Sequence, residues 1–154
     1  MGLVIALNKG RILEECLPLL ARCRIQPEES PDKSRKLIFN SLTGGHRLII
    51  ARSADVPTYV ENGVADVGIT GKDTILEYGS AMSFYERLDL GIGRCAMMTA
   101  AQVDVAEPPG VLRVATKFMN IARHYYQGQG RQVSLIKLSG ALEIAPLLGL
   151  ADCI

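Results

Sequence analysis

Residues 3–11, LVIALNKGR, place a short continuous apolar run directly before a polar turn that contains a glycine. Such a run is typical of a strand that is buried on both faces of a parallel sheet. From Ile12 onward, apolar side chains recur at i, i+4 and i+8, which predicts an amphipathic helix after the turn. A buried strand, a turn and a helix in this order indicate an α/β fold.

Strands and helices are predicted to alternate along the rest of the chain. Short apolar runs predict the strands, and apolar stripes that follow capping or turn residues predict the helices. In chain order we expect a hairpin of strands over 36–39 and 47–51, a helix over 56–63, a strand over 67–69, a helix over 74–78, extended segments within 88–99, a strand over 113–116, a helix over 120–127, a strand over 132–138, a helix over 142–148 and a strand over 151–154. This alternation predicts mainly parallel sheets.

Glycines and prolines in the middle of the chain indicate a boundary between two lobes. Gly91 and Gly93 interrupt an extended stretch, and a Pro-Pro-Gly turn follows at residues 108–110. We therefore expect a first α/β lobe over residues 1–92 and a second over residues 93–154. The final predicted strand ends without a turn, a cap or a charged tail, so we expect the second lobe to be incomplete.

Composition and charge exclude several classes of protein. Seventeen Lys and Arg against sixteen Asp and Glu give a net charge of +1, which argues against a nucleic-acid binder recruited by a basic surface. The chain has neither an apolar run long enough to span a membrane nor a signal peptide, so we expect a cytoplasmic protein. The four cysteines lack C-x-x-C spacing and nearby histidines, so we expect neither a zinc site nor a disulfide framework.

Polar residues, glycines and cations gather at the predicted junctions between strands and the helices that follow them. In an open parallel sheet these junctions lie at the carboxyl edge, where ligands bind. Glycine lets the backbone approach an anion, and Lys or Arg supplies the opposite charge. The junctions are residues 8–11, 52–55, 70–73, 116–117 and 138–141. Each is weak evidence alone, because glycine is a common turn residue, but together they favour a polyanionic substrate.

Other recognised motifs are absent from the chain. It contains no G-x-x-x-x-G-K-[ST], no G-x-G-x-x-G and no G-x-S-x-G, which excludes P-loop, dinucleotide-binding and hydrolase interpretations. His46 and His124 are expected to be packing or surface residues. Four carboxylates could bind Mg²⁺ or carry acid–base chemistry: Asp55, Asp66, Asp73 and Glu143. Helix capping explains Asp55 and Asp73 equally well, and we assign no side chain as a metal ligand.

Six segments of the chain together carry a resemblance to a known family. They are residues 5–11, 34–37, 52–60, 63–73, 113–117 and 139–152. The most specific are GVADVGITGKD at residues 63–73 and SGALEIAPLLGLAD at residues 139–152. In this order they resemble the catalytic subunit of ATP phosphoribosyltransferase. The N-terminal half is most similar to the short form, which lacks a fused regulatory domain and works with a separate subunit resembling histidyl-tRNA synthetase.

The resemblance implies a fold, a reaction and partners. The fold would be the two-lobed, type II periplasmic-binding-protein-like α/β architecture, with the active site in the cleft. The reaction would transfer the phosphoribosyl group of phosphoribosyl pyrophosphate to N1 of ATP, giving phosphoribosyl-ATP and pyrophosphate in the first step of histidine biosynthesis. Mg²⁺ would be bound through the substrate pyrophosphate. The chain would bind ATP, phosphoribosyl pyrophosphate, further copies of itself and the synthetase-like subunit, but neither nucleic acid nor membranes.

The resemblance also implies roles for the junction residues. The barrier lies in the departure of a highly charged group from an oxocarbenium-like centre, so positioning and electrostatics matter more than a nucleophilic side chain. Lys9, Arg11 and Arg35 are expected to be the catalytic cations on pyrophosphate, and Arg52 is expected near the ATP phosphates. The other expected substrate-binding residues are Asp55, Gly71, Asp73, Lys117, Ser139 and Gly140.

Two departures from the family pattern accompany the resemblance. Asn8 stands where the family often has Pro or Ser, at a turn position. The family also continues past Ile154 into an acidic loop that cradles the 5′-phosphate of phosphoribosyl pyrophosphate, so the chain as printed is expected to be inactive. The alternative from another class is a non-enzymatic periplasmic-type protein that binds a small anion, because fold analogy alone cannot decide function. Binding of ATP or AMP and a response to Mg²⁺ would distinguish the two.

Overall fold

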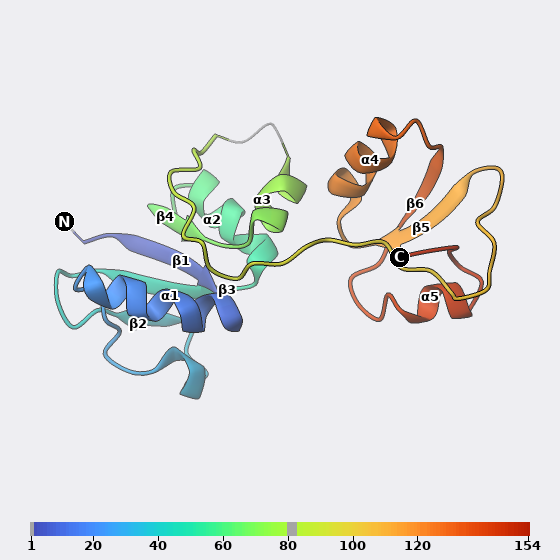
Figure 1. The fold of residues 1–154 in the computed structure, drawn as a ribbon. Coiled ribbons are helices and arrows are strands. Elements are labelled where there is room, and N and C mark those ends of the chain that lie inside the picture. Colours follow the sequence, from blue (N-terminus) through green and yellow to red (C-terminus); the bar gives the residue numbers. More distant parts are fainter. Residues whose placement is uncertain (1, 80–82) are drawn as a thin grey trace. The chain divides into compact units, whose positions relative to one another are not determined.

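The fold consists of two α/β units in a computed structural model that describes residues 2–79 and 83–154. Residues 1–94 form unit 1 and residues 95–154 form unit 2. Each unit has its own sheet, and three of the four strand pairs are parallel (Figure 1). The expected α/β class with mainly parallel sheets is therefore confirmed. In the described part of the chain, no helix has both the length and the apolar character that crossing a bilayer requires.

Unit 1 contains a four-stranded sheet with the order β2-β3-β1-β4. Its strands are β1 (Val4–Asn8), β2 (Ile38–Asn40), β3 (Arg47–Ala51) and β4 (Val67–Ile69). β1 pairs in parallel with both β3 and β4, whereas β2 is antiparallel to β3 and forms the predicted hairpin with it. The carboxyl ends of β1, β3 and β4 consequently share one edge of the sheet.

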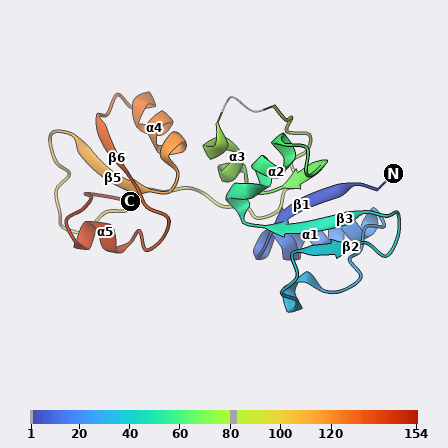
Figure 2. The same cartoon turned by 180° about the vertical axis from the view of Figure 1, so that it is seen from behind.

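Helices cover both faces of this sheet. The helical elements of unit 1 are α1 (Arg11–Arg22), the 3₁₀ turn η1 (Pro31–Lys33), the 3₁₀ turn η2 (Ser53–Asp55), α2 (Val56–Glu61) and α3 (Lys72–Tyr78). Because successive strand residues point to opposite faces, Ile5 and Leu7 pack with Leu13 of α1, while Ala6 packs with Val56 of α2. α1 accordingly lies in front of the strands in Figure 1 and behind them in Figure 2.

Unit 2 has the same layering on a smaller sheet. Its elements are β5 (Leu112–Thr116), α4 (Met119–Gly128), β6 (Val133–Lys137) and α5 (Ile144–Leu147). β5 and β6 are parallel. Val114 packs with Tyr126 of α4, whereas the next residue, Ala115, packs with Ala145 of α5. The two helices therefore cover opposite faces of the β5–β6 pair.

Two segments predicted to be extended form no regular strand. Residues 88–99 contain no strand, because Gly91 and Gly93 both have positive φ and break the extended conformation. Residues 151–154 form only two isolated bridges, both at Cys153. The prediction of a strand over residues 151–154 was therefore wrong, whereas residues 88–99 were predicted only as extended segments that Gly91 and Gly93 interrupt.

The end of the chain nevertheless lies beside β5. Cys153 forms a parallel bridge with Val114 and an antiparallel bridge with Ala101. Ile154 and Ala100 exchange two backbone hydrogen bonds of 2.9 and 3.0 Å. Val114 also pairs with Leu135 of β6, so the last residues extend the sheet of unit 2 on the other side of β5.

Candidate functional site

Three junctions of unit 1 meet at one edge of its sheet, which we call the unit 1 edge. Asn8, the last residue of β1, is in register with Ala51, the last residue of β3. Leu7 is in register with Ile69, the last residue of β4. The residues that follow these strands therefore lie side by side. Six of the predicted site residues are in these junctions: Lys9, Arg11, Arg52, Asp55, Gly71 and Asp73.

Arg35 reaches the same edge from the opposite direction. β2 is antiparallel to β3, so the start of β2 lies beside the end of β3. The Ile50 N–H donates to the carbonyl oxygen of Leu37 at 2.8 Å. Arg35 precedes Leu37 by two residues and so lies close to the end of β3, where Arg52 follows. The strand register thus brings Arg35 to the unit 1 edge, although only the family resemblance had singled it out.

Three cations at the unit 1 edge have no partner in the described part of the chain. Lys9, Arg35 and Arg52 are exposed, and their side chains form no hydrogen bond or ion pair with another described residue. Like charges at one edge repel each other, and none of these three is paired with a described carboxylate. A phosphate-bearing ligand would remove this repulsion and gain charge-assisted hydrogen bonds. The unit 1 edge is therefore suited to a polyanion.

Two neighbouring lysines, by contrast, already have partners. Lys36 donates to Glu29, and Lys72 donates to Glu86. The hydrogen bond with Glu29 raises the pKa of Lys36 above its ordinary value. Exposed pairs of this kind contribute little to stability, but they neutralise the two lysines. Lys9, Arg35 and Arg52 therefore keep charges that no described carboxylate neutralises.

Arg11 contacts the chain itself. Its Nη2 donates to the carbonyl oxygen of Gly93 at 3.2 Å and to that of Arg94 at 3.5 Å. Its Nε lies 3.6 Å from Oε1 of Glu15, and Oε2 of Glu15 accepts a hydrogen bond from the Gly93 N–H at 2.9 Å. Sequence reasoning missed the involvement of Glu15. The only available signal was its i, i+4 spacing from Arg11 on one helix.

Gly10 shapes the first junction between β1 and α1. It precedes α1 with φ of 92°, a conformation that favours glycine. No side chain caps α1, so the N–H groups of its first turn are free to bind a ligand. The N-terminus of a helix carries partial positive charge, which adds to the attraction for phosphate at this edge.

The two junction carboxylates of unit 1 differ in their surroundings. Asp55 precedes α2 but makes no capping hydrogen bond through its side chain. Asp73 is half-buried, and its Oδ1 accepts the Thr74 N–H at 2.8 Å in the first turn of α3. Helix capping therefore does not account for Asp55. Its exposed carboxylate can accept hydrogen bonds from a ligand.

The carboxyl edge of unit 2 holds the other three predicted site residues. Thr116 at the end of β5 is in register with Lys137 at the end of β6. The junctions that follow these two residues are joined by a hydrogen bond of 3.1 Å from the Leu138 N–H to the Thr116 carbonyl oxygen. The predicted residues in these junctions are Lys117, Ser139 and Gly140, all of them exposed.

Lys117 lies at the turn from β5 into α4. The Oγ1 of Thr116 accepts the Phe118 N–H at 3.0 Å, which fixes the turn. The Nζ of Lys117 lies 4.5 Å from the centre of the Phe118 ring. This cation–π contact is weak at an exposed position. Lys117 has no carboxylate partner among the described residues, so its charge is available to a ligand.

The two histidines and the four cysteines are not among the candidate site residues. His46 accepts the Leu3 N–H through Nδ1 at 3.0 Å, and His124 is exposed on α4. All four cysteines are free. Within residues 2–79 and 83–154, no three His, Cys, Asp or Glu side chains come close enough together to hold a metal ion.

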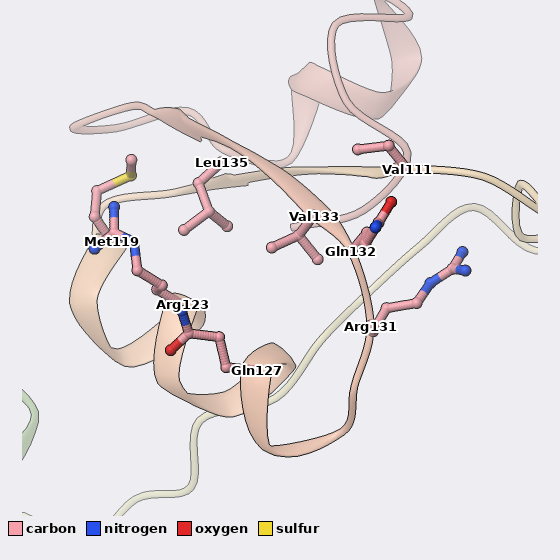
Figure 3. Close-up of a pocket in the computed structure, with 8 residues that line it drawn as sticks. All are labelled: Val111, Met119, Arg123, Gln127, Arg131, Gln132, Val133 and Leu135. Atoms are coloured by element: carbon pink, nitrogen blue, oxygen red, sulfur yellow. The ribbon is translucent and has the colours of Figure 1, made fainter.

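A separate hollow of about 580 Å³ lies beside α4 and β6 in unit 2 (Figure 3). Its lining includes Met119 and Arg123 of α4 and Val133 of β6. Arg131, at the rim, turns its guanidinium away and donates to the Pro108 carbonyl oxygen at 2.6 Å. None of the predicted site residues lines this hollow, so it is not part of the candidate site.

Three comparisons with known proteins agree with one another. A family model described as HisG: ATP phosphoribosyltransferase matches residues 52–154. Relatives named ATP phosphoribosyltransferase from Ectopseudomonas mendocina and Pseudomonas paraeruginosa are each 59% identical over 150 residues, which is 97% of this chain and 71% of each relative. A solved ATP phosphoribosyl transferase (HisG:HisZ) complex from Thermotoga maritima gives a TM-score of 0.77 at 30% identity, over 99% of this chain and 72% of that chain.

Proposed function

Because the chain belongs to the ATP phosphoribosyltransferase family, we propose that the cations at its two carboxyl edges bind the phosphate groups of the substrates. The enzyme is a glycosyltransferase that moves the phosphoribosyl group of phosphoribosyl pyrophosphate to N1 of ATP, in the first step of histidine biosynthesis. The names of the relatives favour this activity over the alternative of a non-enzymatic anion receptor. The observation that carries the site proposal is the gathering of Lys9, Arg35 and Arg52, without partners, at the unit 1 edge.

The reaction itself explains why cations would be the catalytic groups. N1 of ATP forms a bond to C1 of the ribose, and the bond from C1 to the pyrophosphate oxygen breaks with its electron pair. Negative charge therefore grows on the departing pyrophosphate. Preorganised positive groups stabilise such charge more in the transition state than in the ground state. Lys9, Arg11 and Arg35 are the residues that we assign to this role.

We assign the nucleotide to the same unit. Arg52 follows β3 directly and would pair with the ATP phosphates. Asp55 and Asp73 are hydrogen-bond acceptors, so they suit hydroxyl or amino groups of the nucleotide rather than its phosphates. Gly71 lies in the junction between β4 and α3, beside these residues in sequence. Unit 1 would thus serve ATP and the leaving pyrophosphate.

The unit 2 edge would bind phosphoribosyl pyrophosphate. Lys117 supplies a positive charge that no described carboxylate neutralises. Ser139 offers a hydroxyl, and Gly140 has no side chain that would keep a phosphate from the backbone. A cation, a hydroxyl and accessible backbone are suitable partners for phosphate oxygens.

We place Mg²⁺ on the pyrophosphate of the substrate. Mg²⁺ prefers oxygen donors and is commonly held by substrate phosphates with few protein ligands. The phosphate oxygens of the substrate are the hard donors that such an ion requires. Bound there, the ion contributes charge neutralisation to the leaving group.

We also propose that the chain assembles with further copies of itself and with a separate regulatory subunit that resembles histidyl-tRNA synthetase. The solved relative from Thermotoga maritima is a HisG:HisZ complex. The last helix of unit 2, α5, and the residue after it expose Ile144, Leu147 and Leu148 to solvent. Exposed apolar side chains that cluster in this way often mark protein interfaces. We place the enzyme in the cytoplasm together with its nucleotide substrate.

Replacement of Arg35 tests the proposed site. Removal of one preorganised donor of this kind typically costs about 3 kcal/mol, or roughly 100-fold in rate. We expect Arg35→Ala to lower kcat of the complete enzyme by about that factor with a smaller change in KM, because the charge it meets grows during the reaction. Stability should change by less than about 1 kcal/mol, since Arg35 is exposed and unpartnered. The rate of phosphoribosyl-ATP formation and the melting temperature are the measurements.

Arg22→Ala is the matched control. Arg22 is also exposed, its side chain has no described partner, and it ends α1, about 16 Å along the helix axis from Arg11. Its replacement removes the same charge and should leave kcat unchanged. An unchanged kcat in Arg35→Ala would contradict the assignment, as would an activity loss that is matched by unfolding.

A further inference from the structure

Two side chains of α1 hold the backbone N–H and carbonyl groups of one residue in the segment that ends unit 1. Glu15 Oε2 accepts the Gly93 N–H at 2.9 Å, and Arg11 Nη2 donates to the Gly93 carbonyl oxygen at 3.2 Å. The two side chains also meet each other, since Arg11 Nε lies 3.6 Å from Glu15 Oε1. Glu15, Arg11 and Gly93 therefore form a closed set of contacts, which we call the Arg11–Glu15 clamp.

The fit of Gly93 against α1 is close. Gly93 has φ of 60°, which favours glycine, and a Cβ at this position would lie 3.3 Å from Cγ1 of Ile12. The preceding apolar residues Leu90 and Ile92 pack against the main core of unit 1. The segment is thus anchored by apolar contacts and completed by the polar clamp. Unit 1 ends one residue later, at Arg94.

Arg11 and Glu15 make more contacts than an isolated i, i+4 ion pair on one helix would make. Arg at position i and Glu at i+4 is the weaker orientation for such a pair, and both side chains are exposed. The additional feature is the hydrogen bond from the Gly93 N–H to Glu15, 78 positions apart in sequence. A hydrogen bond from a backbone N–H to a carboxylate is charge-assisted and stronger than a neutral one. Glu15 therefore contacts both Arg11 and a distant backbone segment at the same time.

We propose that Glu15 is a positioning residue that holds the Arg11 guanidinium at the unit 1 edge, with Gly93 as the third member of the clamp. Arg11 would then meet the departing pyrophosphate already oriented, with Nη1 free of described partners and the guanidinium directed by the ion pair of Nε with Glu15 and the hydrogen bond of Nη2 to Gly93. Only the kinetic consequence of this inference rests on the proposed function of Arg11. The clamp itself can be tested without substrate.

Amide exchange at Gly93 tests the clamp. An N–H that is bonded to a carboxylate exchanges with solvent only when that bond opens locally. We expect Glu15→Ala to raise the exchange rate of the Gly93 amide by about tenfold or more. Glu15→Gln should raise it less, because the amide oxygen can still accept the hydrogen bond. Glu14→Ala is the matched control, since Glu14 is exposed on the same turn of α1 and its side chain has no described partner.

Steady-state kinetics of the complete enzyme test the positioning role. If the Arg11 guanidinium must become ordered during each turnover, the cost appears in kcat and hardly in the affinity for substrate. We therefore expect Glu15→Ala to reduce kcat by about tenfold with little change in KM. Glu15→Gln should recover part of the loss, and Glu14→Ala should match the unaltered enzyme. These three variants together separate the positioning effect from a general loss of helix stability.

Two results would overturn the inference. One is an unchanged Gly93 exchange rate in Glu15→Ala, which would show that the clamp does not hold the segment. The other is a raised exchange rate with an unchanged kcat, which would show that the clamp does not position a catalytic group. Failure of the proposed function is recognised separately, because Arg11→Ala would then retain full kcat while Gly93 exchange still responded to Glu15.

Discussion

Asp152 joins the last segment of unit 2 to β5 through several hydrogen bonds with one arginine. Its Oδ1 accepts a hydrogen bond from Nη2 of Arg113 at 2.6 Å. Its Oδ2 accepts two more, from the Arg113 backbone N–H at 2.8 Å and from the Arg113 Nε at 3.3 Å. Nη1 of Arg113 donates to the Gly149 carbonyl oxygen at 2.8 Å. These bonds hold the residues next to Cys153, which bridges to Val114 of β5.

The contact between Asp152 and Arg113 predicts that the stability of the protein depends on pH in the acid range. The hydrogen bonds from Arg113 hold the pKa of Asp152 below its ordinary value of 3.8. A carboxylate whose pKa is lower in the folded state contributes stability above its unfolded pKa and loses that contribution as the pH falls through the folded pKa. We expect Asp152→Asn to be less stable than the unaltered protein at neutral pH, and the difference to shrink below pH 3.8.

Urea unfolding of the two proteins as a function of pH checks this expectation. Asp104→Asn is the matched control, because Asp104 is an exposed carboxylate of unit 2 whose side chain has no described partner. Parallel stability profiles of Asp152→Asn and the unaltered protein across the acid range would show that the contact with Arg113 does not contribute to folding.

Single-residue roles could be predicted only in part from the sequence. The parallel-sheet rule alone could predict that residues after β1 and β3 gather at one edge, because it needs only the order of strands and helices. Which cations there lack a partner depends on contacts that sequence spacing does not encode. Glu15 is the clearest case, since its bond to Gly93 joins positions 78 residues apart.

At the level of elements, Gly68 allows β4 to pack closely against α2. A Cβ at Gly68 would lie 2.8 Å from Cγ2 of Val60 and 2.9 Å from Cγ1 of Val56. Valine is β-branched and has little rotational freedom, so these side chains cannot easily move aside. α2 directly follows η2 (Ser53–Asp55), and its displacement would therefore disturb the junction after β3 as well.

Gly68→Ala should consequently destabilise unit 1. Excess volume in a well-packed interior typically costs about 1–3 kcal/mol, and we expect the free energy of unfolding to fall by this amount in urea titrations. Gly110→Ala is the control, because a Cβ at Gly110 has no neighbour within 4 Å. If both variants were equally stable, the contact between β4 and α2 would be looser than the structure shows.

Elements with a regular apolar pattern and the interruption at Gly91 and Gly93 could be predicted from the sequence, whereas the pairing of the last residues could not. The apolar run before residues 8–11 gave β1, and the stripe after it gave α1. The stretch over 88–99 has apolar residues but forms no strand, because two glycines with positive φ break it. The last residues, 151–154, form a bridge rather than a strand, since Cys153 is the only bridging residue there.

At the scale of the whole chain, the two units present ligand-binding groups in the same way. Each has helices on both faces of its sheet, and successive buried residues of β1 and β5 pack on opposite faces. The predicted cations in the junctions at the carboxyl ends are exposed, so they lie there without burying charge in the core. The alternation of strands and helices was sufficient to predict this layering, because it depends on apolar periodicity alone.

The cations of unit 1 should matter through their position and not through net charge. The double variant Arg35→Ala/Arg52→Ala removes two charges from the unit 1 edge, whereas Arg22→Ala/Arg47→Ala removes two exposed arginines from the end of α1 and the start of β3. The net charge is the same in both.

The most direct test of the proposed phosphate-binding role compares kcat/KM of these two double variants. Both are measured in the complete enzyme by the rate of phosphoribosyl-ATP formation. We predict a loss of about 1,000-fold or more for Arg35→Ala/Arg52→Ala, because two preorganised donors are removed. We predict a change within about threefold for Arg22→Ala/Arg47→Ala, which affects only the long-range field. Equal losses in the two variants would contradict a phosphate-binding role for the carboxyl edge of unit 1.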